Sequence, residues 1–305
     1  MTPPASTTAP TPSSLSSSGN LRGIGAMVAA VGFFSVMDAL LKTLAASYPA
    51  MQVAALRGWA ALPLVVLYVL WRGEVRGLLK VRWPLHLLRG VLNVSMLAMF
   101  AYALKELGLA EAYTLFFIAP LIITALSTVV LGEKVRGVHW VAIALGLVGV
   151  VVALRPSQDA FFTVGALAVL GAAVGYAVSA ITGRVLTRTD SSASLVFWTT
   201  TFLALGAGVL ALPNWVGVQQ AHWPLVAGLA VTGFAGQLAI TEAFRHGQAA
   251  VVAPFEYTAL AWGMGLDWVL WQAVPGVSTL VGGAIIIGSG LYLVRQERTQ
   301  AVVPP

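Results

Sequence analysis

The sequence predicts an all-α, polytopic membrane protein of ten transmembrane helices, arranged as two inverted five-helix repeats. Three observations lead to this prediction: the composition, ten long apolar runs, and a likeness between the two halves. Of the 305 residues, 58% are hydrophobic and only 9% are charged, and the mean hydropathy is +0.87. A soluble domain carries roughly 25% charged residues, so most of this surface must face lipid.

The apolar runs set the predicted helices. A bilayer core of ~30 Å needs a helix of roughly 20 residues. Backbone groups cannot stay unpaired in lipid, so each run is expected to be helical. The predicted spans are 23–45, 50–71, 84–104, 109–131, 137–154, 163–186, 193–212, 223–244, 248–271 and 276–294.

The charged loops predict the orientation. If the N-terminus is inside, most Lys and Arg residues fall on the inner side, and the outer side holds only Lys42, Lys105 and Arg155. Positively charged short loops stay in the cytoplasm, so both termini are expected there, with the protein in a bacterial inner membrane. The net charge of +6 then reflects membrane orientation rather than nucleic-acid binding.

The two halves resemble each other near their ends. The segments from Gly137 to Arg155 and from Gly276 to Arg295 both open with Gly-Val, carry a late glycine and close on Leu or Val before Arg. Because each repeat would hold an odd number of helices, the second must enter the membrane upside down. The alternative is that glycine-rich apolar helices align by chance.

These observations predict four segments. The first 20 residues are rich in Ser, Thr and Pro and lack the charged and apolar parts of a signal peptide, so we expect a disordered tail. The repeats are predicted at 21–155 and 156–298, and a second tail at 299–305.

Two short motifs resemble a known family. Leu-Gly-Glu-Lys follows the fourth span at 131–134, and a Gly-Leu-x-Gly-Val pattern before Leu-Arg closes the first half at 146–155. With the five-plus-five layout, they look like the drug/metabolite transporter superfamily, EamA type. Segments 37–42 with Arg57, and 253–257, are similar to a subgroup that includes riboflavin and S-adenosylmethionine transporters. One departure is Trp271-Gln272-Ala273, where the family often has a second Gly-Glu.

Charged residues inside the spans are the first candidates for a functional site. Each costs at least ~2.5–3.5 kcal/mol at a helix centre, so it must face a partner or a wet cavity. Arg89 and Glu242 lie close enough to span ends to reach the surface, so we rank them lower. The remaining candidates are Asp38, Arg57, Glu256 and Asp267, with Lys42 nearer the surface.

Asp38 and Arg57 are predicted at one depth. Each lies about seven residues, or ~10 Å, from the outer end of its span. They could pair across the first hairpin, and Lys42, four residues after Asp38, is a second candidate partner. Two interpretations stay open: a structural ion pair that holds the spans together, or groups that bind a charged substrate or relay a proton.

Glu256 is predicted near the midplane, at the depth of Gln237 on the preceding span. Pro254 removes one backbone hydrogen bond beside it and should kink the helix. A carboxyl group that changes protonation there would suit proton coupling. The alternative is a buried structural Glu that Gln237 or a Tyr hydroxyl satisfies.

Weaker candidates complete the predicted site. Pro120 breaks the fourth span, and Asn93 could face the same cavity. Tyr257 and Trp59 could stack on a flat ring, because they lie near Glu256 and Arg57. We therefore assign substrate binding to Asp38, Arg57, Glu256, Tyr257, Trp59, Asn93 and Gln237. We assign coupling or gating to Lys42, Asp267, Pro120 and Pro254.

The sequence gives little support for metal binding, cofactor binding or enzyme catalysis. The chain has no cysteine, its four histidines share no helical face, and no phosphate-cradling loop occurs. We therefore predict no metal, no cofactor and no enzyme activity. The leading hypothesis is a secondary transporter of a small polar or charged metabolite, with riboflavin, S-adenosylmethionine or an amino-acid-like compound as candidate cargo. The expected partners are that substrate and the bilayer, with a proton and a second copy in a homodimer as further candidates. Two alternatives stay open: a membrane-embedded enzyme acting on a lipid-linked substrate, and a channel or scramblase.

Overall fold

The computed structural model describes residues 17–104, 106–107, 109–155, 163–272 and 274–302, and most of them are helical. The predicted tail segments 1–16 and 303–305, the start of the second repeat at 156–162, Lys105 and Ala273 lie outside the described residues. The α-helices are α1 (Ser17–Ala45), α2 (Ala50–Arg72), α3 (Trp83–Ala103), α4 (Leu109–Phe116), α5 (Ala119–Val130), α6 (Gly137–Leu154), α7 (Val164–Leu186), α8 (Ser192–Ala211), α9 (Trp223–His246), α10 (Ala249–Val252), α11 (Ala259–Trp271) and α12 (Val277–Val302). Short 3₁₀ helices lie at η1 (Val75–Gly77), η3 (Leu212–Asn214), η4 (Gln220–His222) and η5 (Ala253–Thr258).

The predicted spans match the helices, except that the fourth and the ninth are broken. In the described ranges, nine helical segments are long and apolar enough to cross a membrane. One of them joins α4 and α5 across a break at Phe117 and Ile118. The run 248–271 is not the continuous α-helix that we predicted, because it divides into α10, η5 and α11. Pro254 has no N–H to donate to the carbonyl four residues earlier, so the α-helical bonding pattern stops there.

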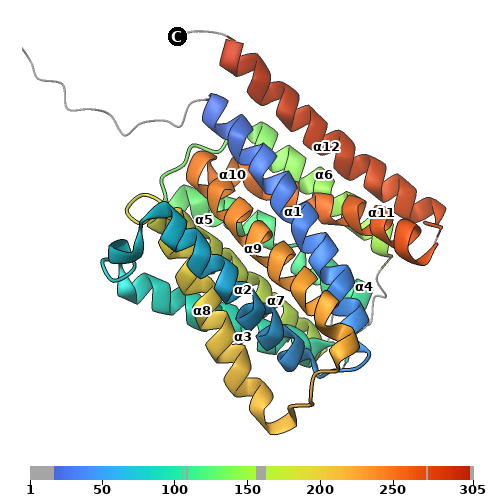
Figure 1. The fold of residues 1–305 in the computed structure, drawn as a ribbon. Coiled ribbons are helices and arrows are strands. Elements are labelled where there is room, and N and C mark those ends of the chain that lie inside the picture. Colours follow the sequence, from blue (N-terminus) through green and yellow to red (C-terminus); the bar gives the residue numbers. More distant parts are fainter. Residues whose placement is uncertain (1–16, 105, 108, 156–162, 273, 303–305) are drawn as a thin grey trace, which may run out of the picture.

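Both terminal helices extend into segments that were predicted as tails. α1 begins at Ser17 and α12 continues to Val302. Asn20 explains the early start, because its side chain donates a hydrogen bond to Glu297 at 2.9 Å and accepts one from the backbone N–H of Gln248 at 3.1 Å. α1 therefore begins and α12 ends at the same end of the bundle (Figure 1). We call this end the N-terminal face and the other end the opposite face.

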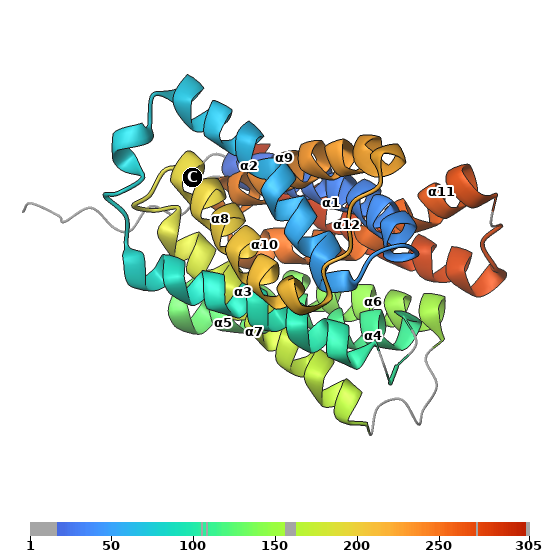
Figure 2. The same ribbon diagram turned by 60° about the horizontal axis from the view of Figure 1, so that its bottom comes forward.

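Helices of the first half pack mainly on helices of the second half. α1 packs on α9, α2 on α8, α3 on α7 and α6 on α12, while α5 packs on α7, α10 and η5 (Figures 1 and 2). Small residues allow close approach: a Cβ on Gly58 would lie 2.7 Å from the Cα of Ala204. The contact between the halves therefore runs through the whole molecule and surrounds its centre.

Candidate functional site

A cavity of about 340 Å³ lies between the two halves. Its lining comes from α1, α2, α3, α4, α5, α7, α8, α9, η5 and α11. Small-molecule sites have volumes of roughly 300–1,000 Å³, so this cavity could hold a compact metabolite. The charged residues on its lining are Asp38, Arg57, Arg89 and Glu256.

Asp38 and Arg57 face the cavity from α1 and α2 without forming an ion pair. Their charged atoms attract each other but are farther apart than 4.0 Å. The guanidinium carbon of Arg57 lies 5.6 Å from the ring centre of Phe34, a cation–π distance. Within the described residues, neither charged group has a hydrogen-bond partner, so the predicted structural pair does not form here.

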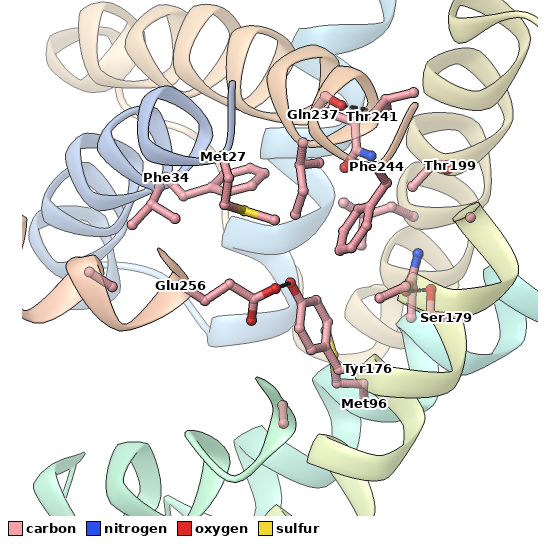
Figure 3. A pocket seen from close by; sticks show the side chains of 18 of the residues that line it. Met27, Phe34, Met96, Tyr176, Ser179, Thr199, Gln237, Thr241, Phe244 and Glu256 are labelled. Carbon is pink, nitrogen blue, oxygen red and sulfur yellow. Dashed lines mark hydrogen bonds between the residues drawn. The ribbon is translucent and has the colours of Figure 1, made fainter. Parts of the chain in front are cut away.

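Glu256 is held at the cavity by a tyrosine from another helix. The Tyr176 hydroxyl on α7 donates a hydrogen bond of 3.0 Å to Oε1 of Glu256 (Figure 3). This matches the predicted alternative in which a Tyr hydroxyl satisfies the carboxylate. Gln237 also lines the cavity, and its backbone carbonyl accepts from Thr241 at 2.7 Å. The second carboxylate oxygen of Glu256 has no hydrogen-bond partner among the described residues.

The contact between α3 and α7 carries further polar groups. Ser179 donates a hydrogen bond of 2.8 Å to Oδ1 of Asn93, and both residues line the cavity. Arg89 lies one turn before Asn93, beside Gly183 of α7. Its Nε and Nη1 are buried without a hydrogen-bond partner among the described residues.

Sequence reasoning missed Tyr176 and ranked Arg89 low. Position along a helix gives distance from the membrane surface, and Arg89 is near enough to the start of α3 to reach that surface. It turns inward because Gly183, on a different helix, leaves room for its guanidinium. A glycine facing an arginine across two spans is a signal that could have been searched for.

The predicted stacking residues lie outside the cavity lining. Tyr257 is 1% exposed and packs against Phe117, in the space left by Gly146. Trp59 is 43% exposed and its ring lies 5.2 Å from that of Trp215. Both side chains point away from the charged centre because their helices turn a neighbouring residue, Glu256 or Arg57, toward it.

The predicted gating residues divide into two groups. Pro120 lines the cavity at the start of α5, whereas Pro254 is buried in η5 behind it. Lys42 does not pair with Asp38; its Nζ donates to Oδ1 of Asp267 at 3.3 Å, between α1 and α11 near the opposite face. Asp267 lies four residues before the end of α11 and the pair is exposed, so Asp267 is not the deep charge that we predicted.

Aromatic rings form part of the cavity wall. The lining includes Phe34, Tyr113, Phe116, Phe117 and Tyr176, and the rings of Phe116 and Tyr176 lie 5.6 Å apart. Charged groups set in an apolar, aromatic wall can hold a solute that has both charged groups and a flat or apolar part.

Comparisons with known proteins agree with one another. The model of the EamA-like transporter family matches residues 21–155 and 163–295. The pseudopaline exporter of Pseudomonas aeruginosa is 30% identical over 271 residues, which cover 87% of this chain and 93% of the exporter. The riboflavin transporter of Vibrio cholerae is 28% identical, with 82% and 84% covered. The S-adenosylmethionine uptake transporter of Rickettsia felis is 27% identical, with 91% and 94% covered.

A solved crystal structure has the same fold. It superposes with a TM-score of 0.78 at 21% sequence identity, with 93% of this chain and 100% of the other covered.

Proposed function

Because the chain belongs to the EamA-like transporter family, as its motifs predicted, we propose that it is a secondary-active transporter that moves a small polar or charged metabolite by alternating access. One observation carries the proposal. The cavity between the halves is lined by Asp38, Arg57 and Glu256, and none of the three is in an ion pair among the described residues.

Unpaired charges in a membrane protein need an explanation. Each costs ~2.5–3.5 kcal/mol at a helix centre, and a purely structural role would bring opposite charges together. Here Arg57 stays beyond 4.0 Å from Asp38, and within the described ranges Glu256 accepts only the Tyr176 hydrogen bond. Groups with unused bonding capacity can bind a charged substrate, and binding that differs between two states shifts their balance.

The packing pattern supports ten spans in two inverted repeats, 21–155 and 156–298. Counting α4–α5 and α10–α11 as single spans, the second span of each half packs on its counterpart, as does the fifth. The first span of each half packs on the third of the other, and the fourth spans meet at α5, α10 and η5. A twofold rotation that exchanges the halves produces this pattern, and such an axis in the membrane plane is typical of secondary transporters.

The gating roles follow from the two broken spans. Breaks beside Pro120 and Pro254 interrupt the fourth span of each half next to the cavity. Bending there would open one face while the other closes. The Lys42–Asp267 pair would restrain the opposite face, and Glu256 would take up and release a coupled proton.

The proposed setting is a bacterial inner membrane with both termini in the cytoplasm, because most basic residues then lie inside. The relatives carry riboflavin, S-adenosylmethionine or pseudopaline. Candidate cargo is accordingly riboflavin, S-adenosylmethionine or an amino-acid-like compound. Since these relatives include an exporter and uptake transporters, flux must be measured in both directions.

Proteoliposomes test the proposal. We expect saturable flux of at least one of these compounds, and a loss of about tenfold or more in Asp38→Asn, Arg57→Gln and Glu256→Gln. Arg72→Gln is the control, since Arg72 is half exposed and lies outside the cavity lining. If a proton is coupled, a pH gradient should drive flux in the wild type but not in Glu256→Gln.

Other outcomes would contradict the proposal. Flux that rises linearly with concentration would indicate a channel or scramblase. Conversion of a lipid-linked substrate without flux would indicate an enzyme. Normal flux in all three cavity variants would mean that the unpaired charges do not bind the cargo.

A further inference from the structure

We infer that Arg89 binds a carboxylate of the substrate while Glu256 binds its protonated amine, so that the cargo is an amino-acid-like zwitterion rather than a neutral compound such as riboflavin. This inference rests on the proposed function and narrows it to one chemical class. It adds Arg89 to the binding residues and assigns the two charged groups of the cargo to different residues.

The guanidinium of Arg89 has unused donors in a confined space. Its Nε and Nη1 are buried and have no hydrogen-bond partner among the described residues. A Cβ on Gly183 would lie 3.2 Å from its Cζ and 3.3 Å from its Nη2, so α7 provides the room that this group occupies. A planar guanidinium with buried, unpaired N–H groups is well suited to a carboxylate, which it can bind through two parallel hydrogen bonds.

Among the residues that the structure describes, no Asp or Glu forms an ion pair with Arg89. His86, three residues before Arg89 on α3, is bound to Asp190 at 2.8 Å, and Tyr176 lies within electrostatic range of Arg89. The same Tyr176 holds Glu256 with its hydroxyl. Tyr176 therefore interacts with two groups that have no ion-pair partner among the described residues, the guanidinium of Arg89 and the carboxylate of Glu256.

The levels of Arg89 and Glu256 suit the carboxylate and the amine that an amino-acid-like cargo carries on one carbon. Arg89 lies six residues into α3, ~9 Å from the N-terminal face, and Arg57 lies seven residues into α2, ~10 Å from the opposite face. Glu256 lies seven residues after Ala249, where α10 starts at the N-terminal face, so it is ~12 Å deep and close to the level of Arg89. A carboxylate at Arg89 and an amine at Glu256 leave the aromatic wall and the Asp38–Arg57 region for the rest of the cargo.

A neutral cargo would leave these groups unsatisfied. Buried polar groups that lose water without gaining a partner weaken binding, which is how sites built for polar substrates reject analogues that lack the polar group. Riboflavin carries neither a carboxylate nor an amine that is protonated at neutral pH. S-Adenosylmethionine carries both.

The test compares two ligands that differ by one carboxylate. Binding of S-adenosylmethionine and of its decarboxylated analogue is measured on the purified full chain in detergent, with riboflavin as a neutral probe. We expect the wild type to prefer S-adenosylmethionine by about 10- to 100-fold. Arg89→Gln should weaken S-adenosylmethionine binding by a similar factor and leave the analogue unchanged, which erases the preference.

A second variant keeps the inference testable if Arg89→Gln does not fold. Gly183→Ala favours the helix and displaces the guanidinium only slightly, so we expect a loss of a few-fold for S-adenosylmethionine alone. Gly175→Ala, on the same helix, is the matched control, because its nearest neighbours are 4.0 Å away. Arg72→Gln controls for the loss of one positive charge.

Each outcome bears on a different claim. An equal loss for both ligands in Arg89→Gln, or none, overturns the role of Arg89. Failure of the wild type to bind S-adenosylmethionine, with saturable flux of riboflavin in proteoliposomes, overturns the zwitterion class and leaves the transport function standing. Absence of saturable flux for every probe, including those that bind, overturns the transport function itself.

Discussion

The two faces of the helix bundle are held together in different ways. At the N-terminal face, Glu133 and Arg184 form an ion pair of 3.5 Å with side chains only 6% and 7% exposed. At the opposite face, Lys42 and Asp267 form an ion pair of 3.3 Å with side chains 59% and 51% exposed. Both pairs join the first half to the second, so burial is the main difference between them.

The buried pair is also tied to backbone at several points. Arg184 donates from Nη1 to the carbonyls of Phe244 and Arg245, at 2.6 and 3.1 Å. Glu133, from the Leu-Gly-Glu-Lys motif, accepts from the backbone N–H of Ala250 at the start of α10. The motif acid therefore links three elements around the broken span, and opening this face requires their separation.

A second buried cluster lies at the same face. Glu297 accepts hydrogen bonds from Arg136 at 2.5 Å and from Asn20 at 2.9 Å, and His139 lies 3.5 Å away. The difference between the faces suggests that the N-terminal face is the costlier one to open. Substitutions at each face can test this comparison.

The largest effect is expected from Arg184→Met. The substitution leaves Glu133 buried without its cation, which typically destabilises a protein by about 3–5 kcal/mol. Unfolding of the detergent-solubilised chain by heat or denaturant measures the loss. The double variant with Glu133→Gln should recover part of it, because no uncompensated charge remains. A loss below about 1 kcal/mol would show that this pair does not hold the N-terminal face.

The sequence predicts a feature of the fold well when the cause lies within one segment, and poorly when the cause is a contact with a distant segment. Nine of the ten predicted spans match long apolar helical segments in the described ranges, because lipid imposes length and apolarity on every helix separately. The division of 248–271 into three pieces was not predicted, because Pro254 indicates a kink but not a 3₁₀ segment. Asn20 was assigned to a tail because its partner Glu297 is 277 residues away.

The same limit applies to the prediction of the candidate site. Asp38, Arg57, Asn93, Gln237 and Glu256 line the cavity, and a charged or polar residue deep in a span was enough to select them. Tyr257 and Trp59 were selected by sequence proximity, which does not determine the helix face. Lys42 was a second candidate partner for Asp38, yet it pairs with Asp267 because α11 lies beside α1.

A smaller effect is expected from Glu297→Gln. The amide keeps the shape and a hydrogen-bond acceptor for Asn20 but loses the charge that attracts Arg136 and His139. We expect a loss of about 1–3 kcal/mol in the free energy of unfolding. Arg298→Gln, an exposed neighbour on α12, is the control and should change it by less than about 0.5 kcal/mol. Equal losses in the two variants would mean that burial does not strengthen this cluster.

The smallest effect is expected from Lys42→Met, which keeps the apolar stem and removes the charge. Exposed ion pairs contribute roughly 0–1 kcal/mol, and salt screens them further. Unfolding in low salt and in 1 M NaCl measures both contributions, and the small loss should vanish in high salt.

The same variant also tests the comparison kinetically. The chain has no cysteine, so Ser179→Cys gives a single thiol on the cavity lining. If the exposed pair restrains the opposite face, Lys42→Met should raise the rate at which a membrane-impermeant maleimide reaches this thiol from that side of a liposome. Arg184→Met should raise it from the other side. A loss of stability in Lys42→Met as large as in Arg184→Met, persisting in high salt, would mean that exposure does not distinguish the two faces.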